Sequence, residues 1–221
     1  MRLLALLSLC LVLVGCGSVR KPSLRSATGL EEAKLRDALG PLLAASGIWR
    51  GPEDGCAVAL GIETLRAIDL GVGPHPRCKF GLVVTTGALR SLDQHELQTA
   101  LAHEIGHVQL GHFSSRAARR QVEPKAPDRG DRGSPVESDN GQGLGQSRAY
   151  DRQEELAADR YAVELLDKLA GSPGRGCTSV MTLIERLDLE RLAPMWSHWL
   201  NTHPTPGARL AALGEICPKT P

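Results

Sequence analysis

Two histidines four residues apart, with a glutamate directly after the first, constrain this chain more than any other feature. The motif His-Glu-x-x-His occupies residues 103–107, and the apolar residues around it recur at helical spacing. Side chains at positions i and i+4 of a helix lie about 40° apart around its axis. His103 and His107 can therefore bind one metal ion, while Glu104 lies beside them and can reach a water molecule on that ion.

The third metal ligand does not follow in the same helix. A pattern in which a glycine and a third histidine follow the motif would need them at positions 110 and 113, where this chain has Leu110 and Phe113. His112 is one place off, and on a continuing helix it would be rotated by roughly 140° from His107. We therefore interpret His112 as a polar residue at the end of the helix.

A later helical segment offers a carboxylate instead. Glu155 and Asp159 are four residues apart and share one helical face. Glu155 would complete a His-His-Glu set for one Zn²⁺ per chain, a donor set typical of catalytic zinc. Asp159 would hold a ligand histidine through its other ring nitrogen. Glu154 is an alternative ligand, but Asp159 does not share the helical face on which Glu154 lies. The non-functional alternative is a solvated acidic helix start.

The first residues of the chain have the composition of an export signal. Arg2 precedes an apolar run over residues 3–14, which as a helix would be about 18 Å long and too short for a bilayer core of about 30 Å. Small residues then lead to Cys16, an ending that resembles the lipobox of bacterial lipoproteins. In those proteins the cysteine is acylated after cleavage, and Gly17 in the next position favours the outer membrane.

Three regions follow from this interpretation. We expect a signal peptide over residues 1–15, and then a lipidated Cys16 with a tether to residue 28. Residues 29–221 would form one domain held at a membrane by the acyl chains. No later segment is apolar enough to cross a bilayer, so lipid on the cysteine would be the only anchor.

Composition narrows the remaining classes of function. Hydrophobic residues make up 42% of the chain and charged residues 23%, which is ordinary for a globular protein. The formal net charge is +1. Proteins that bind nucleic acid usually carry a clear basic excess, so we expect no nucleic-acid partner.

Four cysteines remain once the signal peptide has left and Cys16 carries the lipid. An even number of cysteines in an oxidising compartment indicates disulfides, and four cysteines allow three pairings. We favour Cys56–Cys78 with Cys177–Cys217, because these two bonds close the shortest loops.

The expected elements are mainly helices with a few strands. Capping-box pairs and apolar periodicity predict the helices, and runs rich in Val, Ile and Leu predict the strands. Helices are expected at about residues 28–45, bent or ended by Gly40-Pro41, and at 93–108, 151–170, 180–192 and 206–215; strands are expected at 56–62 and 81–86, with a turn-rich connection at 71–76. Residues 121–146 are rich in glycine and charge and predict a flexible polar loop. The fold class is α+β and mostly helical, with a small β-sheet beside the active-site helix.

The motifs, taken in order along the chain, resemble those of one protease family. They are the run at 81–92, the His-Glu-x-x-His helix, the segment Glu155-Leu-Ala-Ala-Asp159-Arg160, and Thr202-His203-Pro204 with Arg209. This order is similar to that of the HtpX-like and BepA-like zinc metallopeptidases, relatives of the CAAX prenyl endopeptidases, over roughly residues 56–213. The resemblance implies a compact gluzincin-type metallopeptidase domain. It implies that His103, His107 and Glu155 bind zinc and that Glu104 is the general base.

The resemblance also implies roles for residues outside the motif. In such enzymes the strand before the active helix binds the substrate by edge pairing; here that strand consists of Gly81, Leu82, Val83, Val84, Thr85 and Thr86. His203 would steady the tetrahedral intermediate or cover the zinc at rest, the alternative being a helix-entry residue. Arg209 would pair with an acidic residue of the site, the alternative being a surface charge. Many relatives have apolar segments in the place of the polar loop at 121–146. We therefore do not expect this chain to be an integral membrane member of the family.

The expected function is that of a zinc metalloendopeptidase of the bacterial cell envelope, held by its lipid on the periplasmic side of the outer membrane. Its expected substrates are unfolded or misassembled envelope proteins. The main alternative is a latent or non-catalytic assembly factor or adaptor on the same fold, with His203 over the metal. A weaker alternative is hydrolysis of peptidoglycan crosslinks, which also uses zinc. Nothing in the sequence indicates an oligomeric state.

Overall fold

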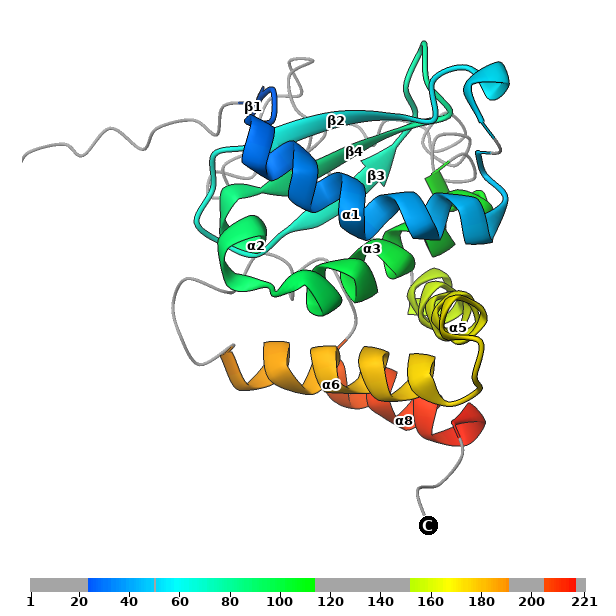
Figure 1. The fold of residues 1–221 in the computed structure, drawn as a ribbon. Helices are drawn as coiled ribbons and strands as arrows, with labels where there is room; N and C mark the ends of the chain where they lie inside the picture. Colours follow the sequence, from blue (N-terminus) through cyan, green and yellow to red (C-terminus); the bar gives the residue numbers. More distant parts are fainter. Residues whose placement is uncertain (1–23, 50, 114–151, 191–204, 218–221) are drawn as a thin grey trace, which may run out of the picture.

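The computed structural model describes residues 24–49, 51–113, 152–190 and 205–217 (Figure 1). The signal peptide, Cys16, the polar loop at 121–146 and His203 lie outside the described residues. The described part is mostly helical and contains one small mixed sheet, which confirms the α+β class expected from the sequence. No helix among the described residues is both long and apolar enough to span a bilayer.

Four strands and six α-helices make up this part of the chain. The strands are β1 (Leu24–Arg25), β2 (Val58–Glu63), β3 (Leu70–Gly73) and β4 (Phe80–Thr85). The helices are α1 (Gly29–Ser46), α2 (Thr86–Ser91), α3 (Gln94–Gln109), α5 (Arg152–Ala170), α6 (Arg175–Glu190) and α8 (Pro206–Ile216), with a short 3₁₀ turn at Pro52–Asp54.

The sheet has the order β1-β2-β4-β3. Strand β4 pairs in parallel with β2, with Ile62 opposite Val84, and pairs antiparallel with β3, with Val72 opposite Leu82. Every residue of β4 is buried. A strand that is covered on both faces reads as a continuous apolar run rather than an alternating one, which is why Phe80–Thr85 is rich in Val and Leu.

The structure corrects one expectation about local structure and narrows another. Residues 70–73 form strand β3, although 71–76 was expected to be a turn-rich connection. Gly71 and Gly73 are turn residues in most contexts, but here they pair with Val83 and Gly81 of β4. Helix α1 also continues through Pro41, so it does not end there. Pro41 and Asp37 are exposed, so water can reach the Asp37 carbonyl that loses its helical donor.

Helix α3 is the central element of the fold. It packs against α1 and β3 on one side and against α5 and α6 on the other, as Figure 1 shows. Leu97, Leu101 and Ile105 are almost completely buried along its core-facing side. Burial of each such side chain contributes roughly 1.5–3 kcal/mol, so packing as well as helix propensity holds α3 in place.

Two disulfides link segments of the described part of the chain. Cys56 is bonded to Cys78, which joins the segments leading into β2 and β4. Cys177 is bonded to Cys217, which joins α6 to the end of α8. This is the pairing that the loop-length argument favours, and it fixes α8 against the helices that carry the functional residues.

Candidate metal centre

Helix α3 brings the two histidines and the glutamate of the motif into the protein interior. Its capping box is formed, since Asp93 and Glu96 each accept a hydrogen bond from the other's backbone N–H. From this start the motif falls in the last two turns of the helix. His103, Glu104 and His107 are all buried there. Burial of three polar side chains on one helix is costly unless they have partners, and so points to a function.

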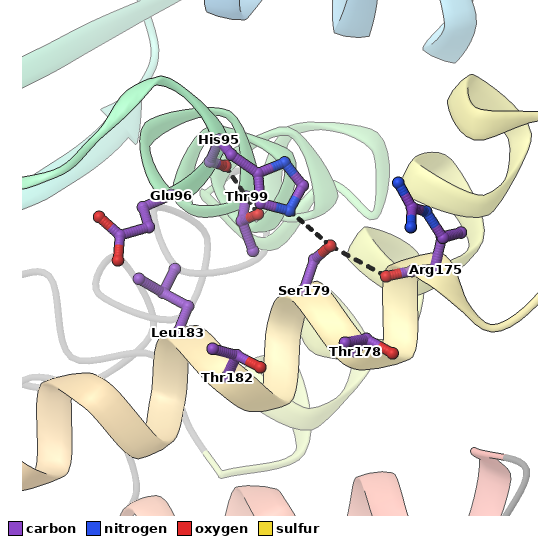
Figure 2. A pocket seen from close by; sticks show the side chains of 8 residues that line it. All are labelled: His95, Glu96, Thr99, Arg175, Thr178, Ser179, Thr182 and Leu183. Carbon is purple, nitrogen blue, oxygen red and sulfur yellow. Dashed lines mark hydrogen bonds between the residues drawn. The ribbon is translucent and has the colours of Figure 1, made fainter. Parts of the chain in front are cut away.

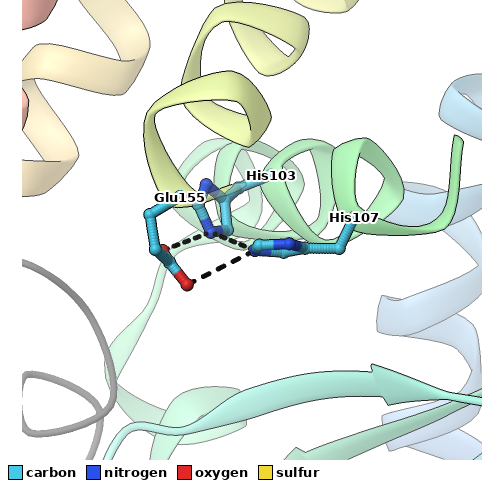
Figure 3. Close-up of side chains that lie close together, drawn as sticks. All are labelled: His103, His107 and Glu155. Atoms are coloured by element: carbon cyan, nitrogen blue, oxygen red, sulfur yellow. Dashed lines mark hydrogen bonds and ion pairs between the residues drawn. The ribbon is translucent and has the colours of Figure 1, made fainter. Parts of the chain in front are cut away.

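Helix α5 supplies a carboxylate that completes a triangle (Figure 3). His103 Nε2 lies 3.1 Å from His107 Nε2 and 3.3 Å from Glu155 Oε2, and His107 Nε2 lies 3.6 Å from Glu155 Oε1. Tetrahedral zinc with ligands at about 2.0–2.1 Å places those ligands roughly 3.3–3.4 Å from one another. The three side chains therefore fit one zinc ion, both in the nature of their donor atoms and in their spacing. Glu155 rather than Glu154 belongs to this cluster.

Asp159 orients His103 from outside the triangle. Its Oδ1 lies 2.9 Å from His103 Nδ1, the nitrogen that faces away from Glu155. A carboxylate at this position accepts the Nδ1 proton, which leaves the lone pair of Nε2 facing the other ligands. The predicted spacing of Glu155 and Asp159 thus places one carboxylate at each ring nitrogen of His103.

Arg209 of α8 holds Asp159 in turn. Its Nε donates to Asp159 Oδ2 at 2.8 Å and a terminal nitrogen donates to Oδ1 at 2.5 Å, a bidentate pair that is fully buried. Burial favours the neutral carboxyl, but the charge and hydrogen bonds of Arg209, with the hydrogen bond of His103, outweigh it and hold the pKa of Asp159 well below its usual range. Arg209 is therefore not a surface charge.

The same contacts determine the charge of His103 when no metal is bound. Burial alone would lower its pKa, but hydrogen bonds with Asp159 and Glu155 outweigh this effect and raise the pKa of His103 to about 9. Two negative carboxylates thus keep the imidazole positively charged near neutral pH. A zinc ion would take the place of that proton.

His112 lies inside the site, contrary to its interpretation as a polar residue at the helix end. It is buried, and its Nδ1 lies 2.8 Å from Nδ1 of His107. The rotation argument failed because α3 ends at Gln109 and the chain then turns at Gly111, which has a φ of 68°. A glycine in the left-handed region commonly ends a helix, so the pair Leu110-Gly111 was the sequence signal for this turn.

The strand at 81–86 cannot bind a substrate by edge pairing, so that expectation was wrong. Strand β4 has β2 on one side and β3 on the other, so neither of its edges is free for an added strand. Thr86 is already the first residue of α2. Within the described residues the outer strands are β1 and β3, and β3 is the strand that packs against α3. The order of strands in a sheet does not follow from the local sequence, which is why the error arose.

A cavity of about 260 Å³ lies between the start of α3 and α6 (Figure 2). His95 Nε2 lies 2.9 Å from Ser179 Oγ, a contact that resembles a serine and its general base. However, Ser179 Oγ donates its proton to the backbone carbonyl of Arg175 at 2.9 Å. The imidazole must then act as donor to the hydroxyl, so this pair is not arranged to activate a nucleophile.

Of three comparisons with known proteins, one identifies a family. The model of Peptidase family M48 matches residues 78–127 and 138–217, more than half of the chain. A similar solved structure is described as the crystal structure of S. mikatae Ste24p, with 16% sequence identity and a TM-score of 0.49; the similarity covers 87% of this chain and 51% of that one. The chain thus spans about half the length of that protein. No curated protein matches the chain.

Proposed function

The chain belongs to peptidase family M48, and from this premise we propose that it is a zinc-dependent endopeptidase of the HtpX-like and BepA-like type. The observation that carries the proposal is the buried triangle of His103, His107 and Glu155, with Glu104 next to it on α3. Two imidazoles and one carboxylate are the ligand set of several zinc peptidases. His103 and His107 would bind through Nε2, and Glu155 through its carboxylate.

Each residue has a distinct task in this reaction. A bound zinc would polarise the peptide carbonyl and lower the pKa of the attacking water. Glu104 takes a proton from that water and then donates it to the departing amine, as a general base and then a general acid. Asp159 keeps the proton of His103 on Nδ1, and Arg209 keeps Asp159 ionised and in position. His203 stays a predicted second catalytic group.

Removal of the general base tests the proposal. The full-length protein in mild detergent is assayed for zinc content and for cleavage of an unfolded model protein, alongside Glu104→Gln. We expect about one zinc per chain in both proteins, with cleavage reduced by at least about 100-fold in the variant. Glu164→Gln on the exposed side of α5 is the matched control and should cleave normally.

Other outcomes separate the alternatives. Zinc bound without cleavage by either protein would favour the latent or adaptor function, and His203→Ala would then be tested for release of activity. Absence of zinc from the wild-type protein would contradict the assignment of His103, His107 and Glu155 as ligands. Cleavage of cell-wall fragments but not of unfolded protein would favour hydrolysis of peptidoglycan.

We propose that the enzyme works in the bacterial cell envelope on unfolded or misassembled proteins. The two disulfides support this compartment, because such bonds persist in oxidising environments. Comparison of one substrate in its folded and unfolded forms would test the substrate class, with cleavage of the unfolded form alone as the expected result. Equal cleavage of both forms would contradict it.

The proposed anchor is a lipid on Cys16, with the domain on the periplasmic side of the outer membrane. Cells that express the wild-type chain or Cys16→Ser would be grown with labelled palmitate and then fractionated. We expect label and membrane association in the wild type, and loss of both in the variant. Unlabelled wild-type protein would rule out the lipid anchor.

A further inference from the structure

Each histidine of the ligand triangle has a partner at its outer ring nitrogen, and the two partners differ in kind. His103 Nδ1 faces the carboxylate of Asp159 at 2.9 Å. His107 Nδ1 instead faces another imidazole, since Nδ1 of His112 lies 2.8 Å away. The two rings are inclined at 66° with their centroids 5.0 Å apart, so they meet nitrogen to nitrogen rather than by stacking.

The chain reaches this contact by ending α3 only two residues after His107. Leu110 caps the helix, and its N–H still bonds to the carbonyl of Gly106. Gly111 then adopts a φ of 68°, which turns the backbone out of the helical path. Residues other than glycine rarely adopt this conformation. The turn brings His112 back over His107, where a continuing helix would carry it away.

A single proton must lie between the two Nδ1 atoms, because a hydrogen bond needs one donor and one acceptor. His107 can bind a metal through Nε2 only if that atom carries a lone pair, and a neutral imidazole then carries its proton on Nδ1. His107 is therefore the donor, and His112 is the acceptor. His112 must accordingly be neutral, with its own proton on Nε2.

We propose that His112 is a positioning residue: its Nδ1 accepts the Nδ1 proton of His107 and so fixes the tautomer and ring orientation in which His107 binds the metal. This inference rests on the proposed zinc function. His112 is not itself a ligand, because its Nδ1 meets the ring edge of His107 opposite to the one that faces Glu155, and the ligand cluster does not include it.

The use of an imidazole rather than a carboxylate has an electrostatic reason. The site already contains the carboxylates of Glu104, Glu155 and Asp159, all buried, with the positive charge of Arg209 engaged by Asp159. A further buried carboxylate would be costly without another cation. A neutral acceptor orients His107 without adding charge.

Zinc affinity tests the proposal. The dissociation constant of zinc would be measured by competition with a chelator for the full chain, His112→Phe and His112→Gln. Phenylalanine fills the space but cannot accept a proton, whereas the amide oxygen of glutamine can. We expect His112→Phe to lose about 10–100-fold in affinity, as for other partners of ligand histidines, and His112→Gln to keep most of it. His95→Phe, an exposed histidine at the start of α3, is the matched control and should bind zinc normally.

The results separate this inference from the proposed function. Wild-type protein that binds zinc, together with His112→Phe that binds it equally well, would overturn the role of His112 and leave the peptidase assignment intact. An equal loss in His112→Gln and His112→Phe would also overturn it, because the acceptor would then not matter.

A second measurement does not depend on any variant. The ¹⁵N shifts and couplings of imidazoles report which ring nitrogen carries the proton. In the unmodified protein, with or without zinc, we expect His107 to be protonated on Nδ1 and His112 on Nε2. The opposite arrangement in either state would overturn the proposal, so the question is decided even if no zinc binds or His112→Phe does not fold.

Discussion

Gly106 of α3 lies directly against the backbone of Ala158 in α5. A Cβ atom built on Gly106 would be 2.9 Å from the carbonyl oxygen of Ala158 and 3.0 Å from its Cα. Gly106 lies immediately before His107, and Ala158 immediately before Asp159. The two helices therefore approach each other closely next to the ligand residues, and this contact helps to determine how near Glu155 comes to the histidine pair.

We expect Gly106→Ala to disturb the site although alanine is the better helix former. The new methyl group must push α5 away from α3, and such overpacking costs roughly 1–3 kcal/mol. The free energy of unfolding from denaturant titration should fall, and zinc should bind more weakly. Gly40→Ala is the control, because nothing lies within 4 Å of a Cβ at that exposed helical position. It should leave zinc binding unchanged and raise stability by up to about 1 kcal/mol. Unchanged zinc affinity in Gly106→Ala would contradict this account.

The pair of Arg209 and Asp159 makes a second prediction about stability. Arg209→Leu removes the cation of a buried ion pair with Asp159, and loss of one member of such a pair costs about 3–5 kcal/mol. Arg209→Lys keeps the charge but not the two parallel hydrogen bonds, so an intermediate loss is expected. Thermal and denaturant unfolding of the metal-free protein would measure both.

The exposed pair of Arg36 and Glu32 provides the control for this measurement. Its ion pair is formed between adjacent turns of α1, and both side chains are more than half exposed to solvent. Pairs of this kind contribute little. A loss in Arg36→Leu as large as that in Arg209→Leu would show that the buried pair has no special role.

The ligand residues could be predicted from sequence because their spacing is local. His103 and His107 share a face of one helix, and so do Glu155 and Asp159 on another, wherever those helices lie. The partner of His107 could not be found in the same way. The contact of His112 depends on a left-handed glycine after the helix, and extrapolation of the helix past Gly111 gave the wrong direction.

The sheet shows a different limit. Strand β4 is apolar enough to be found from its composition, but its position between β2 and β3 depends on contacts with distant segments. Strand β3 was missed because two of its four residues are glycines, which favour turns when no neighbouring strand is considered. Substrate binding by edge pairing was therefore predicted for β4, a strand with a neighbour on each side.

The two disulfides should affect the protein differently. Replacement of Cys177 and Cys217 by alanine opens a loop of sequence separation 40, and replacement of Cys56 and Cys78 opens one of 22. Each change should lower the free energy of unfolding by about 2–4 kcal/mol. Only the first should also weaken zinc binding, because it loosens α8, which carries Arg209. Equal zinc affinity in both double variants would contradict the link from α8 to the metal site.

The raised pKa of His103 predicts how zinc binding depends on pH. Because this pKa, about 9 in the folded metal-free protein, lies above the value of about 6.5 for an unfolded chain, protonation of His103 stabilises that form. The contribution is fully present below about pH 6.5 and is lost as the pH rises through about 9. Zinc binding must displace the same proton. Zinc affinity should therefore rise with pH, whereas the contribution of this proton to stability falls.

We therefore expect zinc to bind about tenfold more tightly for each unit of rising pH between about pH 6.5 and 8.5, with the dependence flattening near pH 9. Calorimetry in two buffers of different ionisation enthalpy would count the protons released per zinc, and about one should come from His103. Asp159→Asn removes a negative charge that raises the pKa of His103, so the flattening should move to lower pH in that variant. An affinity that does not change with pH would show that His103 is already neutral before the metal arrives.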